Sequence, residues 1–170
     1  HAASSVLMSK FSDCNYVTID GFGDFLSTTI GKFSEQKFNT IQDVKFPHSL
    51  GLFYTAITQF LGFKKYGDEY KVMGLSSYGK PIYVDKINKL VKFDNKNLFR
   101  LNLDYFKHHN EGVEMSWLDG EPKLGDVFSN KLVDLLGHPR DKDEKIDSRH
   151  MDIASSTQIV FEEITLKILN

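Results

Sequence analysis

Two β-rich runs joined by a loop with two glycines and two carboxylates constrain the fold of this chain most strongly. The stretch VTIDGFGDFLSTTIG covers residues 17–31, and its loop reads Asp-Gly-Phe-Gly-Asp. Residues 16–19, 25–33 and 37–44 carry the β-branched and aromatic residues that favour strands. Their order predicts a β-meander of two or three strands, preceded by a short helix over residues 2–10.

Helical periodicity follows the meander. Residues 50–63 form a strongly apolar helical pattern, with Ser49 as a suitable N-cap and Gly62 as a stop. Residues 150–169 form a long amphipathic pattern with Ile153, Val160, Phe161, Ile164 and Ile168 on one face. Further expected elements are helices over residues 82–91 and 127–136 and a strand over residues 97–103. The fold class is therefore mixed α/β, a β-meander plus packed helices.

Three stretches lack a clean period and are expected to be loops. Residues 64–81 are rich in glycine and tyrosine, which is typical of a site-forming loop. Residues 104–126 are polar and irregular, with Trp117 as a local packing anchor. Residues 140–149 are highly charged, which indicates a solvated connection within one domain.

The composition narrows the class of partner. The 170 residues are 41% hydrophobic and 26% charged, with a formal net charge of −2, enough apolar content for one domain with a sizeable core. No basic run indicates nucleic-acid binding, and no apolar run approaches the roughly 20 residues that span a bilayer. The single cysteine, Cys14, rules out an internal disulfide and a cysteine-rich zinc site, so we expect a cytoplasmic protein that binds small molecules or protein.

The loop after the first strand has the parts of a phosphate-binding hairpin. Gly21 and Gly23 let phosphate oxygens approach backbone amides, and Asp20 at the loop entry can hold a metal ion beside them. Asp-Gly is also the commonest signal for a plain type I′ hairpin turn. The loop sequence alone leaves both interpretations open.

The histidines show no metal-ligand spacing to one another. His1 can share a metal with a histidine four residues earlier, a position before the first residue, or have no structural role. His48 is expected to cap or pack at the helix entry, His108 and His109 to be exposed, His138 to lie in a turn and His150 to cap the last helix locally. Because no methionine opens the chain and no stop signal follows the last helical pattern, we expect a fragment of a longer protein.

Four segments resemble one family in order and spacing. HAASS, VTIDGFGD, FPHSLGLFYTAITQFLGF followed by EYKVMGLSSYGKP, and RHMDIASSTQ are similar to the amino-terminal region of carbamoyltransferases that include nodulation-factor and antibiotic O-carbamoyltransferases. The resemblance runs from His1 to Asn170, and EYKVMGL with the downstream YG-x-P is its most specific part. It implies part of an actin-like ATPase lobe of the ribonuclease H-like class, with the rest of that domain and a YrdC-like domain outside the chain.

The resemblance also implies a reaction. In the family, ATP and carbamoyl phosphate give carbamoyl-adenylate, and the amino-terminal domain transfers its carbamoyl group to a hydroxyl of the acceptor. A divalent metal, iron in characterised relatives, is held by an H-x-x-x-H pair and aspartates. His1 matches the second histidine and Asp20 the first aspartate, whereas the other two ligands would lie before His1 and beyond Asn170. With half of the ligands, the chain alone is expected to be inactive.

Other roles follow from the same resemblance. Gly21 and Gly23 would bring amides to the phosphate, and Lys71 would either add a positive charge there or pair with Glu69. Asp24 and Asp152 are candidates for the general base by residue type.

A carbamoyltransferase has two alternatives, a noncatalytic module and a sugar kinase. A noncatalytic actin-like binding or scaffold module is the alternative, and the presence of both His1 and Asp20 argues against it. The EYKVMGL segment argues against a sugar kinase of the same superfamily. The sequence does not mark the acceptor. We also expect self-association through the end of the last helix, so a homo-oligomer is compatible with this sequence.

Overall fold

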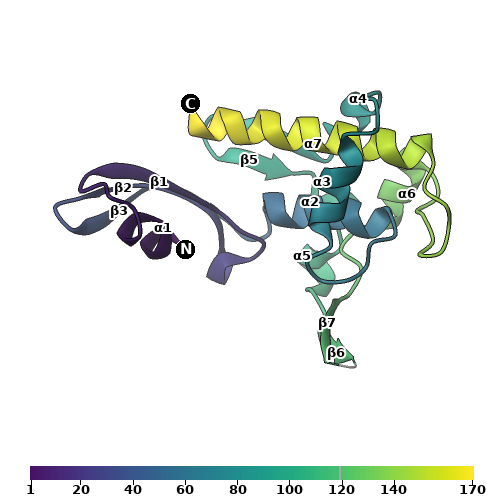
Figure 1. Cartoon of the computed structure of the whole chain (residues 1–170), viewed down its shortest axis with the longest axis horizontal. Coiled ribbons are helices and arrows are strands. Elements are labelled where there is room, and N and C mark those ends of the chain that lie inside the picture. Colours follow the sequence, from purple (N-terminus) through teal and green to yellow (C-terminus); the bar gives the residue numbers. More distant parts are fainter. Residues whose placement is uncertain (119) are drawn as a thin grey trace.

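The chain folds into a mixed α/β structure, which confirms the predicted fold class. A computed structural model describes residues 1–118 and 120–170. Its helices are α1 (Ala2–Leu7), α2 (Leu50–Phe60), α3 (Glu69–Ser76), α4 (Val84–Ile87), α5 (His108–Glu111), α6 (Asn130–Leu136) and α7 (Ser148–Leu169) (Figure 1). Its strands are β1 (Cys14–Ile19), β2 (Leu26–Ser34), β3 (Lys37–Lys45), β4 (Val91–Asp94), β5 (Leu98–Leu101), β6 (Met115–Leu118) and β7 (Glu121–Leu124), with 3₁₀ turns η1 (Gly23–Phe25) and η2 (Leu103–Tyr105).

The first three strands form the predicted meander. They pair antiparallel in the order β1-β2-β3, with Val17 opposite Ile30 in the first pair. Figure 1 shows this sheet extending away from the helices, with α1 packed beside it. Val6, Tyr16 and Phe33 form a small separate core between α1 and the sheet. The sheet therefore meets the rest of the molecule mainly through the ends of its strands.

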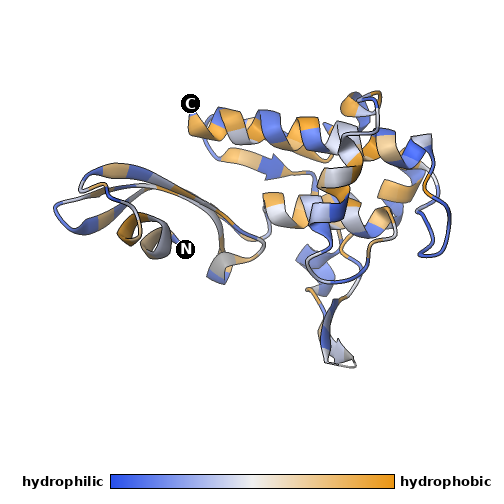
Figure 2. Cartoon of the chain, viewed as in Figure 1, coloured by the Kyte–Doolittle hydropathy of each residue, from blue (hydrophilic) through white to orange (hydrophobic). Residues whose placement is uncertain are grey.

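Helices α2 and α7 organise the main core. The Ser49 hydroxyl accepts the Leu52 amide at 3.0 Å, which confirms the predicted N-cap, and α2 ends three residues earlier than predicted, just before Gly62 with its φ of +79°. Helix α7 packs against α2, α3 and α4, and its predicted apolar residues Ile153, Val160, Ile164 and Ile168 are buried, whereas Phe161 is half-buried with its ring edge to face on Tyr54. In Figure 2, hydrophobic residues recur along α2 and α7, whereas hydrophilic residues occupy other positions of α7. The Asp147 carboxylate and the His150 ring form a capping box at its start, so His150 is a local cap as expected.

Two of the predicted loops contain regular structure. Residues 64–81 include α3, in which only Val72 is buried, so the apolar period that marks a helix is missing. Residues 104–126 include α5 and the hairpin of β6 and β7. Trp117 lies on that hairpin with 70% of its surface exposed, so its assignment as a packing anchor is wrong. Residue Asp119 of this stretch lies outside the described residues. The helix predicted over residues 82–91 shortens to α4, and Val91 begins β4.

The burial of Arg140 contradicts the prediction that residues 140–149 are a solvated connection. Its side chain is buried, with Nε donating to the Leu61 carbonyl at 2.7 Å and the guanidinium 5.0 Å from the Phe63 ring centre. Its Nη1 also donates to the Lys142 carbonyl at 3.2 Å. The end of α2 leaves carbonyls without helical partners, and Arg140 satisfies one of them.

His108 is buried rather than exposed. Its Nε2 lies 2.8 Å from the Pro47 carbonyl oxygen, and its ring meets Phe46 and Phe106 edge to face. The polar local sequence does not indicate this burial because Phe46 and the Pro47 carbonyl, which contact the ring, lie some 61 positions earlier in the chain.

Candidate functional site

The loop after β1 holds the Asp20 carboxylate in one orientation. The backbone amide of Asp20 donates to the Ser27 carbonyl at 2.8 Å, and the amide of Gly21 donates to Asp20 Oδ1 at 2.7 Å. The Ser49 hydroxyl donates to the Asp20 carbonyl oxygen at 2.9 Å. The loop is therefore attached to the start of α2 and is more than a free hairpin turn.

Two glycines shape the space around this loop. A Cβ at Gly51 would lie 2.8 Å from the Gly21 Cα, so the loop packs directly on the first turn of α2. A Cβ at Gly21 would meet nothing within 4 Å, so the loop is open on its other side. The Gly21 amide already donates to the Asp20 carboxylate. The contribution of Gly21 to the site is therefore the space that its missing side chain leaves beside the loop. Gly23 begins η1.

His1 contacts the Asp20 carboxylate. His1 Nδ1 lies 2.8 Å from Asp20 Oδ2, with 73% of the histidine side chain and 32% of the aspartate side chain exposed. Imidazole nitrogen and carboxylate oxygen are suitable ligands for a divalent transition metal. Among the described residues no group of three or more such side chains comes together. The pair therefore fits a metal as part of a coordination sphere.

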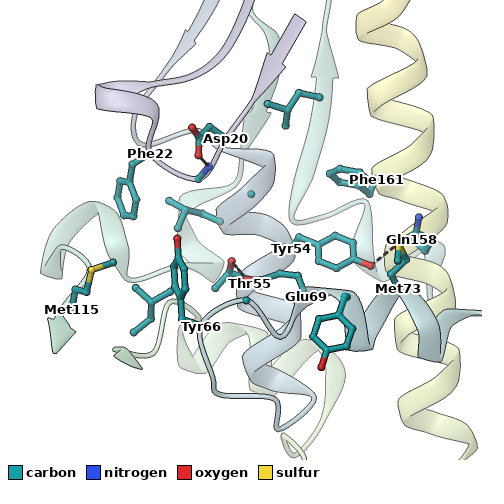
Figure 3. Close-up of a pocket in the computed structure, with 17 residues that line it drawn as sticks. Asp20, Phe22, Tyr54, Thr55, Tyr66, Glu69, Met73, Met115, Gln158 and Phe161 are labelled. Carbon is teal, nitrogen blue, oxygen red and sulfur yellow. Dashed lines mark hydrogen bonds between the residues drawn. The ribbon is translucent and has the colours of Figure 1, made fainter. Parts of the chain in front are cut away.

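A cavity of about 770 Å³ opens beside this loop. Figure 3 shows Asp20 and Phe22 on one side, Tyr66 and Met115 on another, and Tyr54, Met73, Gln158 and Phe161 toward α7. Its walls come from the β1 loop, α2, the segment around α3, the β6–β7 hairpin and α7, and they are mainly apolar and aromatic. Residues 64–81 are predicted to form a site, and part of this segment does line the cavity. The lining residues from it are Tyr66, Gly67, Glu69, Tyr70 and Met73.

Two hydrogen bonds arrange the polar groups of the cavity. Thr55 Oγ1 donates to Glu69 Oε1 at 2.7 Å, and the Tyr54 hydroxyl donates to Gln158 Oε1 at 2.7 Å. Burial raises the pKa of the Tyr54 phenol, and the negative charges of Glu162 and Glu69 raise it further. The cavity thus contains neutral hydroxyl donors beside a carboxylate. Neither Thr55 nor Glu69 has a predicted role in the site, although Glu69 lies in the EYKVMGL segment of the predicted site-forming loop.

Three other predicted site residues lie outside the cavity lining. Lys71 Nζ pairs with Asp68 Oδ1 at 2.7 Å, so the predicted alternative of a Lys71–Glu69 pair is wrong. Asp152 Oδ1 accepts the Lys80 amide at 2.7 Å and anchors the loop before α4.

The third of these residues is Asp24, in the 3₁₀ turn η1. Its φ of +52° lies in the left-handed region, which aspartate tolerates better than most residues. The structure thus brings Asp20, Gly21 and, through its contact with Asp20, His1 together at the cavity. It does not bring Lys71, Asp24 or Asp152 there.

Comparison with known proteins gives the family. A family model described as carbamoyltransferase N-terminus matches residues 1–170, and the chain belongs to this family. It is 37% identical to the uncharacterized protein sll1178 of Synechocystis over 172 aligned residues, which cover 100% of the chain and 26% of that protein. It is 28% identical to nodulation protein NolNO of Sinorhizobium fredii, covering 99% of the chain and 22% of that protein.

A second nodulation protein matches over a shorter region. NolO of Bradyrhizobium diazoefficiens is 39% identical over 109 residues, covering 61% of the chain and 19% of that protein. The chain therefore spans about a quarter or less of the length of these relatives. Within the described part of the chain, no helix has both the length and the apolar character needed to cross a membrane.

Proposed function

We propose that this chain is part of an ATP-dependent O-carbamoyltransferase. The enzyme moves a carbamoyl group from carbamoyl phosphate, through carbamoyl-adenylate, to a hydroxyl of a small-molecule or glycan acceptor. Family membership supports a carbamoyltransferase. The observation that carries the finer proposal is the contact of His1 with Asp20 at the edge of a cavity large enough for an acceptor.

His1 and Asp20 would hold a divalent metal, iron by resemblance, together with ligands from the rest of the protein. When bound, such an ion supplies a Lewis acid for the negative charge that develops during carbamoyl transfer. The hydrogen bonds from Gly21 to the Asp20 carboxylate and from Ser49 to the Asp20 carbonyl orient the aspartate. Orientation of this kind raises metal affinity because the ligand needs no rearrangement on binding.

In the proposed transfer no side chain of this chain forms a covalent bond with the substrate. The acceptor hydroxyl oxygen attacks the carbamoyl carbon, the bond from that carbon to the phosphate oxygen breaks, and AMP leaves with the bonding electrons while the hydroxyl proton passes to a base. The open side of Gly21 leaves room for the phosphate at Asp20. The cavity walls would hold the acceptor and exclude water from the carbamoyl-adenylate.

The complete protein that carries these residues provides the test. It is incubated with ATP, ¹⁴C-labelled carbamoyl phosphate and a small-molecule extract of the source cells, and labelled products are separated and identified by mass. We expect label in a carbamoylated product and pyrophosphate release that depends on both co-substrates. Asp20→Asn should lower product formation by at least about 100-fold, because it weakens a metal ligand, with little change in pyrophosphate release.

Asp134→Asn on α6 is the matched control, because Asp134 is exposed and does not line the cavity. Equal product formation by the Asp20 variant and this control would contradict the proposed metal site. Absence of any labelled product from the unaltered protein would favour the scaffold alternative.

A further inference from the structure

The charged groups of the cavity are of one sign. Its lining includes the carboxylates of Asp20 and Glu69, and no lysine, arginine or histidine is among the described lining residues. Asp20 contacts His1. Glu69 has only the neutral Thr55 hydroxyl at 2.7 Å, and none of the ion pairs found in the described part of the chain involves it. Glu69 is therefore a half-buried carboxylate without a cationic partner.

The nearest lysine along the chain does not neutralise it. Lys71, two residues further along α3, is held by Asp68 at 2.7 Å, and its ammonium lies 5.7 Å from the Phe63 ring centre and 5.9 Å from that of Tyr70. These contacts keep Lys71 out of the cavity lining. A ligand that enters the cavity therefore meets the Glu69 charge directly.

Aromatic rings share the cavity lining with this carboxylate. In the view of Figure 3, Glu69 and Thr55 lie between Tyr66 and Tyr54, and Phe161 lies beyond Tyr54. Tyr66 and Tyr70 are 60% and 63% exposed, so their rings are accessible to a ligand in the cavity. A cation over the face of such a ring gains electrostatic attraction, and a neighbouring carboxylate adds to it.

This combination discriminates between ligand classes. A phosphate group placed beside Glu69, unlike one at the open side of Gly21, would be repelled by the carboxylate, and a neutral polyol there would gain hydrogen bonds without relieving the unpaired charge. An ammonium group would donate hydrogen bonds to Glu69 and would also neutralise its charge. We propose that the cavity binds an amine-bearing alcohol, with its ammonium between Glu69 and the tyrosine rings. That this ligand is the carbamoyl acceptor rests on the proposed function, whereas the preference for an amine does not.

The four methionines of the chain provide a direct test. Met73 and Met115 line the cavity, whereas Met8 and Met151 do not. The complete protein that carries these residues is labelled with ¹³C at its methionine methyl groups and titrated with 4-(aminomethyl)benzyl alcohol, and the NMR signals of these four methionines are followed. The matched neutral probe is 1,4-benzenedimethanol. We expect Met73 and Met115 to shift while Met8 and Met151 do not, and the amine to bind roughly five- to tenfold more tightly than the diol.

Variants of Glu69 separate charge from shape. Glu69→Gln keeps an oxygen that accepts from Thr55 and should bring the two probes to equal affinity. Glu163→Gln on the exposed side of α7 removes the same charge elsewhere and should keep the preference for the amine. The preference should also shrink as sodium chloride rises, which tests the charge without any variant.

Several outcomes would overturn the inference. Equal affinities of the two probes for the unaltered protein would do so, as would tighter binding of the diol or equal shifts of all four methionines. None of these measurements requires ATP or carbamoyl phosphate. A failed binding test therefore leaves the proposed transferase activity standing, and failure of the transferase assay leaves the binding result intact.

Discussion

The Ser49 hydroxyl donates to the Asp20 carbonyl oxygen at 2.9 Å and accepts the Leu52 amide at 3.0 Å. One side chain thus attaches the β1 loop to α2 and also caps that helix. Gly51 lies two residues beyond Ser49 and packs on Gly21. The position of the Asp20 carboxylate is consequently set by the buried helix α2 as well as by the hairpin that carries it.

Ser49→Ala should destabilise the protein and loosen the Asp20 loop together. It removes an N-cap and leaves the Asp20 carbonyl without its hydroxyl donor, so we expect the free energy of unfolding to fall by about 1–3 kcal/mol. Urea denaturation followed by circular dichroism measures this change. Ser77→Ala is the matched control, because Ser77 is exposed at the end of α3, and it should change stability by less than about 0.5 kcal/mol.

Gly51→Ala should disturb the site more than a methyl group elsewhere in a helix. The new Cβ would lie 2.8 Å from the Gly21 Cα and 2.9 Å from the Asp20 carbonyl oxygen, so the loop must move. We expect a loss of about 1–3 kcal/mol in the free energy of unfolding and shifted amide resonances around Asp20.

Gly74→Ala is the control for this substitution. Gly74 lies in α3, and a Cβ there meets nothing within 4 Å. Alanine also favours a helix, so this variant should be neutral or more stable by up to about 1 kcal/mol. If both variants behaved alike, the close packing of α2 on the loop would be incorrect.

The protein should lose stability as the pH falls from about 7 to about 5. Burial lowers the pKa of His48, of His108 and of His150 below 6.5. Below that value the unfolded chain binds more protons than the folded chain, so each histidine stabilises the fold above pH 6.5 and loses that contribution as the pH drops. The slope is at most about 1.4 kcal/mol per pH unit for each histidine.

Urea titrations at several pH values measure this slope. His108→Gln keeps a donor for the Pro47 carbonyl and removes one titrating group, so the slope should decrease. His138→Gln, at a histidine that is exposed in the folded chain, is the matched control. A stability that rises toward pH 5 would contradict the burial of these rings.

Local sequence signals were sufficient where the structure depends on neighbours in the chain. The strand runs on either side of the β1 loop pair as predicted, and the Ser49 cap and the Gly62 stop bound α2 because capping and positive φ are decided within a few residues. The long period of α7 likewise predicts which face is buried. These features required no knowledge of long-range contacts.

Long-range contacts decided the rest. Arg140 is buried because the end of α2, which lies 79 positions earlier at Leu61, supplies a carbonyl acceptor. Helix α3 lacks an apolar period because it presents Glu69 and Tyr70 to a cavity while Val72 is its one fully buried residue. In each case the environment is created by segments distant in sequence, which residue patterns do not record.

The same distinction between local signals and long-range contacts applies to the candidate site. The loop motif alone suggests Asp20, Gly21 and Gly23 as a phosphate- and metal-binding hairpin, because the chemistry of these residue types is local, whereas His1, Lys71, Asp24 and Asp152 are assigned through the family resemblance. Only the tertiary structure brought Glu69 and the tyrosines to the same cavity as Asp20 and directed Lys71 to Asp68. The physical reason is that a cavity is formed where the β1 loop, α2, α3 and α7 pack, and its charge depends on which side chains that packing leaves without partners.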